Sequence, residues 1–462
     1  MHPTSTHRPR RRWSFALLLA VVALLAASCS GRSDSSSSSS SDKGSSGSSG
    51  SSSSGEVVNP DDCASYDGTA GVSGDTITLA SSFPQSGLTA AFAQISKGYK
   101  AYFAKVNADG GVEVAGKKYK IEVVDKDDEY TPAKTVQNIN EEVGADGSKA
   151  FAVFNVVGTA NNVAVRASLG DNCVPNVFAA TGSPVWGNVD YPWTIGSTLA
   201  PYTVEAKAFA DYLKDNKPNA KVAMLVQDDD FGKAYEEGFK KQVEGSDITV
   251  VQVKSYKPGN DNVDSQVTSL AASGADTFFN GATLLACPNA LKAAQTANWD
   301  ATTFVSGTCI SKTLMGIAGD AADKVFATTN IKDPMNPAFK DDEAMQEYRD
   351  TLAQYGAKDV DPDNGIVAYG YTQAALLVEI LGMLPKLDRA TLMNQMYDLK
   401  DVTGGLLIDG VKVNTSTEDR FLTEDVQMIQ YDAANKYFTN VGPVLDFDGT
   451  TPDITPKDLI NS

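Results

Sequence analysis

The sequence predicts an α/β protein with two lobes, each built on a doubly wound parallel sheet. Strand-like apolar runs alternate with helical stretches along the chain, and such alternation places helices on both faces of a parallel sheet. The pattern occurs as two successive series over roughly 400 residues after residue 55, more than one compact core usually holds. We therefore expect two lobes of this class.

The chain begins with a segment typical of a signal peptide. Four arginines, Arg8 and residues 10–12, precede an apolar stretch at Phe15–Ala27, which is shorter than the roughly 20 residues that span a bilayer. Small residues then lead to Cys29, the order of features found in exported proteins. This order resembles a bacterial lipobox, so we interpret residues 1–28 as a lipoprotein signal peptide and Cys29 as the lipidated first residue of the mature chain. An ordinary secretory signal with an incidental cysteine is the alternative.

Residues 29–55 are predicted to be a flexible linker. After Cys29 this stretch is dominated by serine and glycine and has no apolar residue to bury, so it should be a coil with a mean reach of about 25–30 Å. The folded part would then be extracytoplasmic and anchored to the cell membrane by the lipid, in the periplasm or on the outer face of the plasma membrane.

Composition excludes several functional classes. Without residues 1–28 the chain has 35 basic and 58 acidic residues, a net charge of −23, which disfavours nucleic acid and anionic lipid as partners. Both histidines, His2 and His7, lie in the signal segment, so the mature chain has no Ser-His-Asp or Cys-His pair and no imidazole ligand for zinc. There is no glycine-rich phosphate loop, and the acidic stretches at Asp125 and Asp359 lack the glycine and glutamate of an EF-hand. We expect a binding protein, not an enzyme, with no cofactor and no metal.

The predicted strands can be read from the apolar runs. The first series is Ile77–Ser81, Tyr119–Asp125, Ala150–Val157 and Asn176–Thr181, and the second is Lys221–Gln227, Ile248–Val253, Asp276–Gly281, Thr303–Ser306 and Lys324–Thr329. Between the strands, apolar spacings of three and four predict a helix over Thr89–Val106. Thr131 and Pro132 are typical of the start of another helix.

In a doubly wound fold, ligands bind beyond the carboxyl ends of the strands. We therefore expect the site in six loops: Phe83–Gly87, Val157–Asn162, Thr181–Trp186, Asp228–Phe231, Ala282–Ala286 and Gly307–Ser311.

An ordered set of motifs carries a family resemblance. They are the Pro-x-Ser-Gly loop at Pro84–Gly87, Asn-x-x-Gly-Gly-Val at Asn107–Val112, Asp-x-x-Tyr-x-Pro at Asp127–Pro132, and the strand, acidic turn and helix of Val222–Phe239. Over about residues 71–450 the chain resembles the type I periplasmic binding proteins, and within them the leucine/isoleucine/valine-binding group that serves ABC importers.

The resemblance implies two lobes that close on a ligand about a hinge of three crossing strands. We place the crossings near residues 198–201, 327–330 and 420–424. The N-terminal lobe would be residues 56–198 plus 329–420, and the C-terminal lobe residues 199–328 plus 421–462.

The resemblance also implies the ligand contacts. The loops that hold a ligand carboxylate in this family correspond to Gly158, Thr159, Ala180, Thr181, Gly182 and Ser183. The other expected contacts are Ser86, Phe92, Phe231, Thr283, Leu284 and Thr308, with Trp186 as a further candidate for the apolar wall. The alternative for the loops is that they are only tight turns, and for the aromatic residues that they belong to the core.

At the amino end of the ligand the sequence departs from the family. Where relatives commonly use a glutamate to pair the ligand ammonium, this chain has Ser-Gly-Thr-Cys-Ile-Ser, with Cys309 at or beside that position. A buried ammonium without a partner is costly. Either another acid, such as one of residues 228–230, reaches the site, or the ligand is not a zwitterion.

Four cysteines follow Cys29, and an even count in an exported protein favours disulfides. Four cysteines allow three pairings. With the fold that the resemblance implies, we expect Cys63–Cys173 at one edge of the first sheet and Cys287–Cys309 at the ligand-facing edge of the second.

The leading functional prediction is a lipid-anchored, monomeric solute-binding subunit. It would capture a small amino acid, or a related apolar carboxylate or amide, and deliver it to membrane permease subunits of an ABC importer. A sensor that reports to a membrane receptor is the alternative. An exported hydrolase is disfavoured because the mature chain would have no histidine and the sequence has no Gly-x-Ser-x-Gly elbow.

Overall fold

The computed structural model describes residues 56–462 except residues 64 and 145, and within this range it contains two seven-stranded sheets. The lipidation site predicted at Cys29 lies outside the described residues. The first sheet has the order β3-β4-β2-β5-β6-β7, with β1 paired antiparallel to β2. Its strands are β1 (Val72–Ser73), β2 (Thr76–Phe83), β3 (Val112–Val114), β4 (Lys117–Asp127), β5 (Ala152–Phe154), β6 (Asn176–Ala179) and β7 (Thr194–Gly196).

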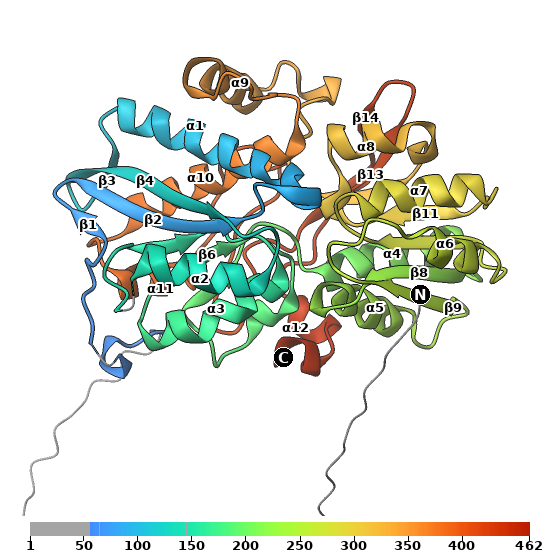
Figure 1. The fold of residues 1–462 in the computed structure, drawn as a ribbon, viewed down its shortest axis with the longest axis horizontal. Helices are drawn as coiled ribbons and strands as arrows, with labels where there is room; N and C mark the ends of the chain where they lie inside the picture. The colour runs from blue at the N-terminus through green and yellow to red at the C-terminus, as the bar shows by residue number, and fades with distance from the viewer. Residues whose placement is uncertain (1–55, 64, 145) are drawn as a thin grey trace, which may run out of the picture. The chain divides into compact units, whose positions relative to one another are not determined.

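Helices cover both faces of the first sheet, as Figure 1 shows. Neighbouring residues of β2 separate the two faces, because Leu79 packs in the cluster that contains α1 and α10 residues while Ala80 packs with residues of α2 and α3. The helices of this lobe are α1 (Gln94–Ala108), α2 (Pro132–Val143), α3 (Thr159–Asp171), α9 (Glu343–Tyr355), α10 (Gly365–Met383) and α11 (Arg389–Met396). We call this sheet with these helices the first lobe.

The second sheet has the order β14-β13-β12-β11-β10-β8-β9 and is also covered on both faces. Phe278 and Phe279 on β10 point into two different apolar clusters, one on each side of the sheet. The strands are β8 (Lys221–Gln227), β9 (Thr249–Tyr256), β10 (Thr277–Gly281), β11 (Thr302–Val305), β12 (Phe326–Thr329), β13 (Val426–Asp432) and β14 (Tyr437–Leu445). The helices are α4 (Tyr202–Asn216), α5 (Asp230–Val243), α6 (Asp264–Ala271), α7 (Ala286–Thr296) and α8 (Lys312–Ala318). We call this sheet with these helices the second lobe.

The α/β class with two mostly parallel sheets is confirmed, and each predicted strand is present. Two differences concern local detail. The helix predicted from Thr89 begins as a 3₁₀ helix, Gly87–Ala93, before α1. Thr131 does precede α2 and Pro132 is its first residue, but the Thr131 hydroxyl does not cap the helix. The short strands β1, β3 and β7 of the first sheet and the antiparallel hairpin β13–β14 of the second were not predicted.

Three chain segments connect the lobes, residues 197–201, 330–342 and 397–425, and polar groups tie them together. The Asn330 side chain donates to the carbonyl of Thr198. Gln373 on α10 both accepts from the Thr198 amide (3.3 Å) and donates to its hydroxyl (2.6 Å). The backbone of Asn330 also accepts from the amide of Ile408 (3.0 Å). These buried bonds fix the geometry of the connections.

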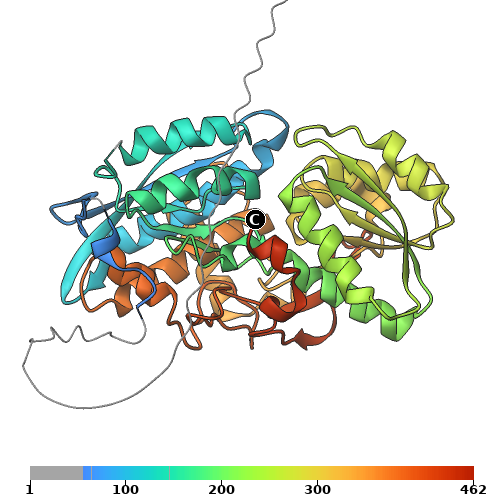
Figure 2. The same cartoon turned by 90° about the horizontal axis from the view of Figure 1, so that it is seen from below.

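The C-terminal helices pack at the junction of the lobes, drawn in red in Figure 2. Helix α12 (Thr451–Ile454) contacts α4 and α5 of the second lobe, while α13 (Lys457–Ile460) contacts the 3₁₀ helix Pro184–Gly187 of the first.

Both expected disulfides are present, Cys63–Cys173 and Cys287–Cys309. The first ties the segment before the first sheet to the turn after α3. The second joins the start of α7 to the loop after β11.

Helix α10 is the one helix among the described residues with the length and hydropathy of a membrane span. Since 78% of its apolar window is buried inside the protein, and it packs along α1, its composition is explained by the core of the first lobe.

Candidate ligand-binding site

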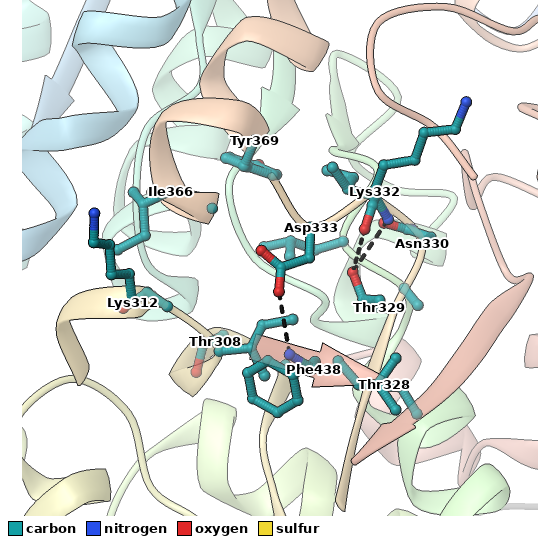
Figure 3. Close-up of a pocket in the computed structure, with 18 of the residues that line it drawn as sticks. Thr308, Lys312, Thr328, Thr329, Asn330, Lys332, Asp333, Ile366, Tyr369 and Phe438 are labelled. Carbon is teal, nitrogen blue, oxygen red and sulfur yellow. Dashed lines mark hydrogen bonds between the residues drawn. The ribbon is translucent and has the colours of Figure 1, made fainter. Parts of the chain in front are cut away.

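A cavity of about 130 Å³ lies where the lobes meet the connecting segments (Figure 3). Both lobes and the connections contribute to its wall, which is mostly apolar, as in sites for small molecules. Its apolar residues include Phe92, Val157, Ile310, Ile366 and Phe438.

Glu205, in the first turn of α4, supplies a carboxylate to this wall. Glu205 is only 3% exposed, and one of its carboxylate oxygens accepts a hydrogen bond from the backbone amide of Gly307 (2.9 Å). Burial raises the pKa of Glu205 to about 7, although the Gly307 amide and the hydroxyls of Tyr235 and Thr328 oppose the shift. Within the described residues, no Lys or Arg pairs with this carboxylate. Glu205 is therefore a buried acid with only uncharged partners.

Asp333 also lines the cavity, but it has a different role. As Figure 3 shows, its carboxylate accepts from the backbone amide of Phe438 (3.4 Å), and it also accepts from that of Met335 (2.9 Å). Burial raises the pKa of Asp333. Its two amide bonds hold a turn of the connecting segment, which is a structural role.

A cluster of hydroxyls lies beside the cavity, at the start of α3. The hydroxyls of Thr159 and Thr181 are 2.6 Å apart, and the Tyr202 hydroxyl donates to that of Thr181 (3.1 Å). Helix α3 begins at Thr159 after Gly158, which has no side chain to cap it. The N–H groups of the first helical turn are thus suited to an anion such as a carboxylate.

Helix α4 connects the acid to the hydroxyls. Tyr202 and Glu205 are one turn apart on this helix, so side chains three residues apart lie on the same face. One reaches Thr181 of the first lobe, and the other reaches Gly307 of the second. The Glu205 carboxylate, which can pair with a cation, and the hydroxyl cluster that Tyr202 joins, which can donate to an anion, are therefore one helical turn apart.

Three of the twelve predicted contacts line the cavity: Phe92, Ala180 and Thr308. Four more join the polar groups around it. Thr159 and Thr181 form the hydroxyl cluster, Gly158 precedes α3, and Thr283 accepts from the hydroxyl of Thr308 (3.0 Å).

The remaining predicted contacts serve packing or turns. The ring of Phe231 packs edge-on against Tyr202, with 4.9 Å between the ring centroids. Leu284 belongs to the same apolar cluster as Phe92. Gly182 accepts from the amide of Tyr202 (2.7 Å), and Ser183 accepts from that of Val185 (3.4 Å).

Ser86 and Trp186 lie apart from the cavity. Ser86 is exposed and donates to Asp127. Trp186 packs with Val185 in a small core cluster, and its indole N–H donates to the carbonyl of Thr181 (3.0 Å).

The acids expected to replace the missing glutamate do not line the cavity. Asp229 caps α5 by accepting from the amides of Phe231 (3.1 Å) and Gly232 (3.3 Å). Asp228 and Asp230 are exposed. Glu205 lines the cavity instead of these acids, and it was not predicted from the sequence. Its spacing from Tyr202 and Phe209 puts it on the buried face of α4, and that pattern was the available signal.

Tyr130 crosses from the first lobe towards the second. It follows β4, and its backbone, like that of Glu129, has a positive φ (60° and 49°). Burial raises the pKa of Tyr130, and the nearby charge of Asp229 raises it further, while a hydrogen bond from Gln227 opposes the shift. Residues 227 and 229 belong to the second lobe, so Tyr130 links the two lobes.

Comparison with known proteins agrees with this architecture. A family model described as periplasmic binding protein matches residues 76–436. The Leu/Ile/Val-binding protein homolog 3 of Brucella melitensis is 30% identical over 207 residues, which are 44% of this chain and 54% of the relative. The chain thus spans about half the length of the curated relative that it matches.

Solved structures share the fold at low sequence identity. A branched-chain amino acid ABC transporter protein from Thermus thermophilus with bound valine has a TM-score of 0.72 and 18% identity, covering 82% of this chain and 98% of its own. A fatty acid ABC transporter substrate-binding protein from Thermomonospora curvata has a TM-score of 0.69 and 20% identity, covering 84% and 96%. Because the family model covers most of the chain, the predicted resemblance is confirmed: the chain belongs to the periplasmic binding protein family.

Proposed function

We propose that this protein captures a small amino acid with an apolar side chain between its lobes and delivers it to an ABC importer of the branched-chain amino-acid type. The observation that carries the proposal is the buried Glu205, which faces the cavity without a charged partner among the described residues. A ligand ammonium would supply that charge, because a buried ionised acid needs a cationic or hydrogen-bonding partner.

The other groups around the cavity fit the rest of such a ligand. The start of α3 with the hydroxyls of Thr159 and Thr181 offers donors to a carboxylate. The apolar wall, including Phe92 and Ile366, offers burial to a side chain. A related apolar carboxylate or amide would use the same wall and donors but would leave Glu205 unpaired, so we favour the amino acid.

The size of the cavity supports a small ligand. About 130 Å³ is comparable to the roughly 150 Å³ of an engineered cavity that holds benzene. Among the structural relatives, one is described with bound valine and another as a fatty acid binding protein. The cavity volume favours a ligand of the first size over a long acyl chain.

We also propose that Cys29 carries the lipid anchor and that the protein acts at the outer side of the membrane. Family membership supports an extracytoplasmic location. Mass spectrometry of the N-terminal peptide would test the anchor. An unmodified Cys29 at the mature N-terminus, or a cleavage elsewhere, would contradict it.

The test of ligand class is a thermal-shift screen of the full chain in mild detergent, followed by calorimetry. The panel contains branched and aromatic amino acids, their deaminated acids and their amines. A ligand at 100 times its dissociation constant adds about 2.7 kcal/mol to the free energy of unfolding. We expect the amino acids to shift the melting temperature and the deaminated acids to shift it much less.

The variant Glu205→Gln makes the test specific. It should weaken amino-acid binding by roughly 30-fold or more, since a charged partner is lost, while binding of a deaminated acid should be almost unchanged. If the deaminated acids bind the parent more tightly than the amino acids, the ligand class is wrong. If Glu205→Gln binds amino acids with the same affinity as the parent, Glu205 does not pair with the ligand.

A further inference from the structure

Five carboxylates gather where the segment before β13 meets the loop after β14. They come from Asp419, Glu424, Asp425, Asp446 and Asp448. One oxygen each from Asp419, Glu424 and Asp448 lies within 4.8 Å of the others. Oxygens that bind one calcium ion at 2.3–2.6 Å are at most about 5 Å apart, so these three can share one ion.

Glu424 is held rigidly in this cluster. Glu424 is 1% exposed, and its carboxylate accepts hydrogen bonds from the backbone amides of Gly449 (2.6 Å) and Thr451 (2.7 Å). Each carboxylate oxygen has two lone pairs, so both retain an acceptor site after these bonds. The loop after β14 therefore orients Glu424 without using up its oxygens.

A second and independent observation comes from Asp425. This residue is 8% exposed, and its Oδ1 is buried with no hydrogen-bond partner among the described residues. Its carboxyl accepts a hydrogen bond from the backbone of Lys412 and lies beside the carboxyls of Asp446 and Asp448. A buried carboxylate oxygen that has no donor and lies among other carboxylates is rare unless a cation is bound there.

Protein cations do not neutralise the cluster. Within the part of the chain that the structure describes, none of the five acids forms an ion pair with Lys or Arg. Two lysines lie near the cluster but pair elsewhere: Lys412, near Asp425 and Asp448, pairs with Asp401 (2.6 Å), and Lys400, near Asp419, pairs with Asp398 (3.7 Å). Two of the acids are more than nine-tenths buried, and buried charges are normally paired or coordinate a metal.

We propose that this cluster binds a calcium ion, with Asp419, Glu424 and Asp448 as direct ligands and Asp425 and Asp446 completing the charge around it. The donors are all oxygens, which calcium prefers and which softer transition metals do not. Calcium also tolerates the irregular geometry of three chain segments, whereas magnesium requires near-octahedral coordination. The ion would tie the third connection between the lobes to the C-terminal segment.

The test is a calcium titration of the full chain in mild detergent after treatment with EDTA and buffer exchange. Calorimetry with CaCl₂ should give one site with a dissociation constant on the order of 10⁻⁵–10⁻³ M, the range of sensor and extracellular calcium modules. The melting temperature should rise by about 3 °C at 100 times that constant. MgCl₂ at equal concentration should have a much smaller effect.

Three variants separate the site from general salt effects. Asp448→Asn, at an exposed position, and Glu424→Gln should each weaken calcium binding at least tenfold. Asp453→Asn, an exposed acid of the same C-terminal segment outside the cluster, should bind calcium like the parent.

Three results would overturn the site. They are no heat and no thermal shift for the parent up to about 10 mM CaCl₂ (roughly ten times the weakest dissociation constant of extracellular modules), an equal response in Asp448→Asn, or an equal response to magnesium. Because Asp448 is exposed, its variant is expected to fold, so a failure of Glu424→Gln to fold would not decide the matter.

Discussion

The backbone amide of Gly307 donates a 2.9 Å hydrogen bond to the carboxylate of Glu205, and so joins the loop after β11 to the first turn of α4. The sequence predicted no acid from this loop itself, and the structure places beside it an acid that comes from a helix about 100 residues earlier (sequence separation 102). The carboxylate at this loop therefore comes from a different part of the chain.

The pKa of Glu205 makes ligand binding depend on pH. Because burial raises this pKa to about 7, the acid is increasingly protonated below neutral pH and can no longer pair an ammonium. The affinity for an amino acid should fall up to about tenfold for each pH unit below 7. Calorimetry between pH 5.5 and 8.5 measures this, with Glu205→Gln as the control that should show a flat profile.

The same group affects stability in the opposite direction. The folded-state pKa is raised above the usual 4.5, so the folded protein binds more protons than the unfolded chain between pH 4.5 and about 7. The contribution of Glu205 is most favourable below pH 4.5 and is lost as pH rises through 7. Glu205→Gln should therefore be more stable than the parent at pH 8, by roughly 2–4 kcal/mol, and almost equal to it near pH 4.5. Urea unfolding at the two pH values tests this, and an equal difference at both would contradict it.

Gly307 is predicted to be needed for the position of Glu205. A Cβ at this residue would lie 3.0 and 3.3 Å from the two carboxylate oxygens, so Gly307→Ala should displace the carboxylate by a few tenths of an ångström. We expect amino-acid affinity to drop by roughly 3–10-fold with little change in melting temperature.

Gly316→Ala is the matched control for that variant. Gly316 lies inside α8, and a Cβ there meets nothing within 4 Å. This exchange should leave affinity unchanged and stabilise the protein by about 0.5–1 kcal/mol. Equal affinities of the two alanine variants would show that the approach of Gly307 to Glu205 has no role in binding.

The two disulfides should contribute unequally to stability. Cys63 and Cys173 are 110 residues apart, whereas Cys287 and Cys309 are 22 apart, and a cross-link restricts the unfolded chain more when its loop is longer. Replacing both cysteines of a pair by serine should cost about 5 kcal/mol for the first and about 3 kcal/mol for the second. Urea unfolding gives the comparison, and a larger loss for the 22-residue loop would contradict the entropic account.

The sequence predicted most of the parallel strands because these are apolar runs that alternate with helices, but it missed β7, which is only three residues long. The hairpin of β13 and β14 was missed because it ends the alternation and has no helix between its strands. Glu205 was missed because a single acid in an apolar helix face carries no local motif, and only the tertiary contact with Gly307 shows its place. The acid cluster around Glu424 was missed for a similar reason, since its carboxylates come from separate segments that only folding brings together.

Tyr130 is predicted to stabilise the arrangement in which the lobes meet. It leaves the first lobe on two residues with positive φ, Glu129 and Tyr130, a conformation that costs on the order of 1–3 kcal/mol per residue and persists only where contacts hold it. Its ring centroid lies 6.5 Å from that of Phe92, and its hydroxyl lies beside Gln227 and Asp229 of the second lobe.

If these contacts keep the lobes closed on a ligand, Tyr130→Ala should increase the rate of ligand dissociation by about tenfold and change the association rate much less. Tyr130→Phe keeps the ring and removes only the hydroxyl, so its dissociation rate should fall between those of the parent and the alanine variant. Stopped-flow measurements resolve both rates, and an unchanged dissociation rate in Tyr130→Ala would mean that the contacts of Tyr130 with the second lobe do not retain the ligand.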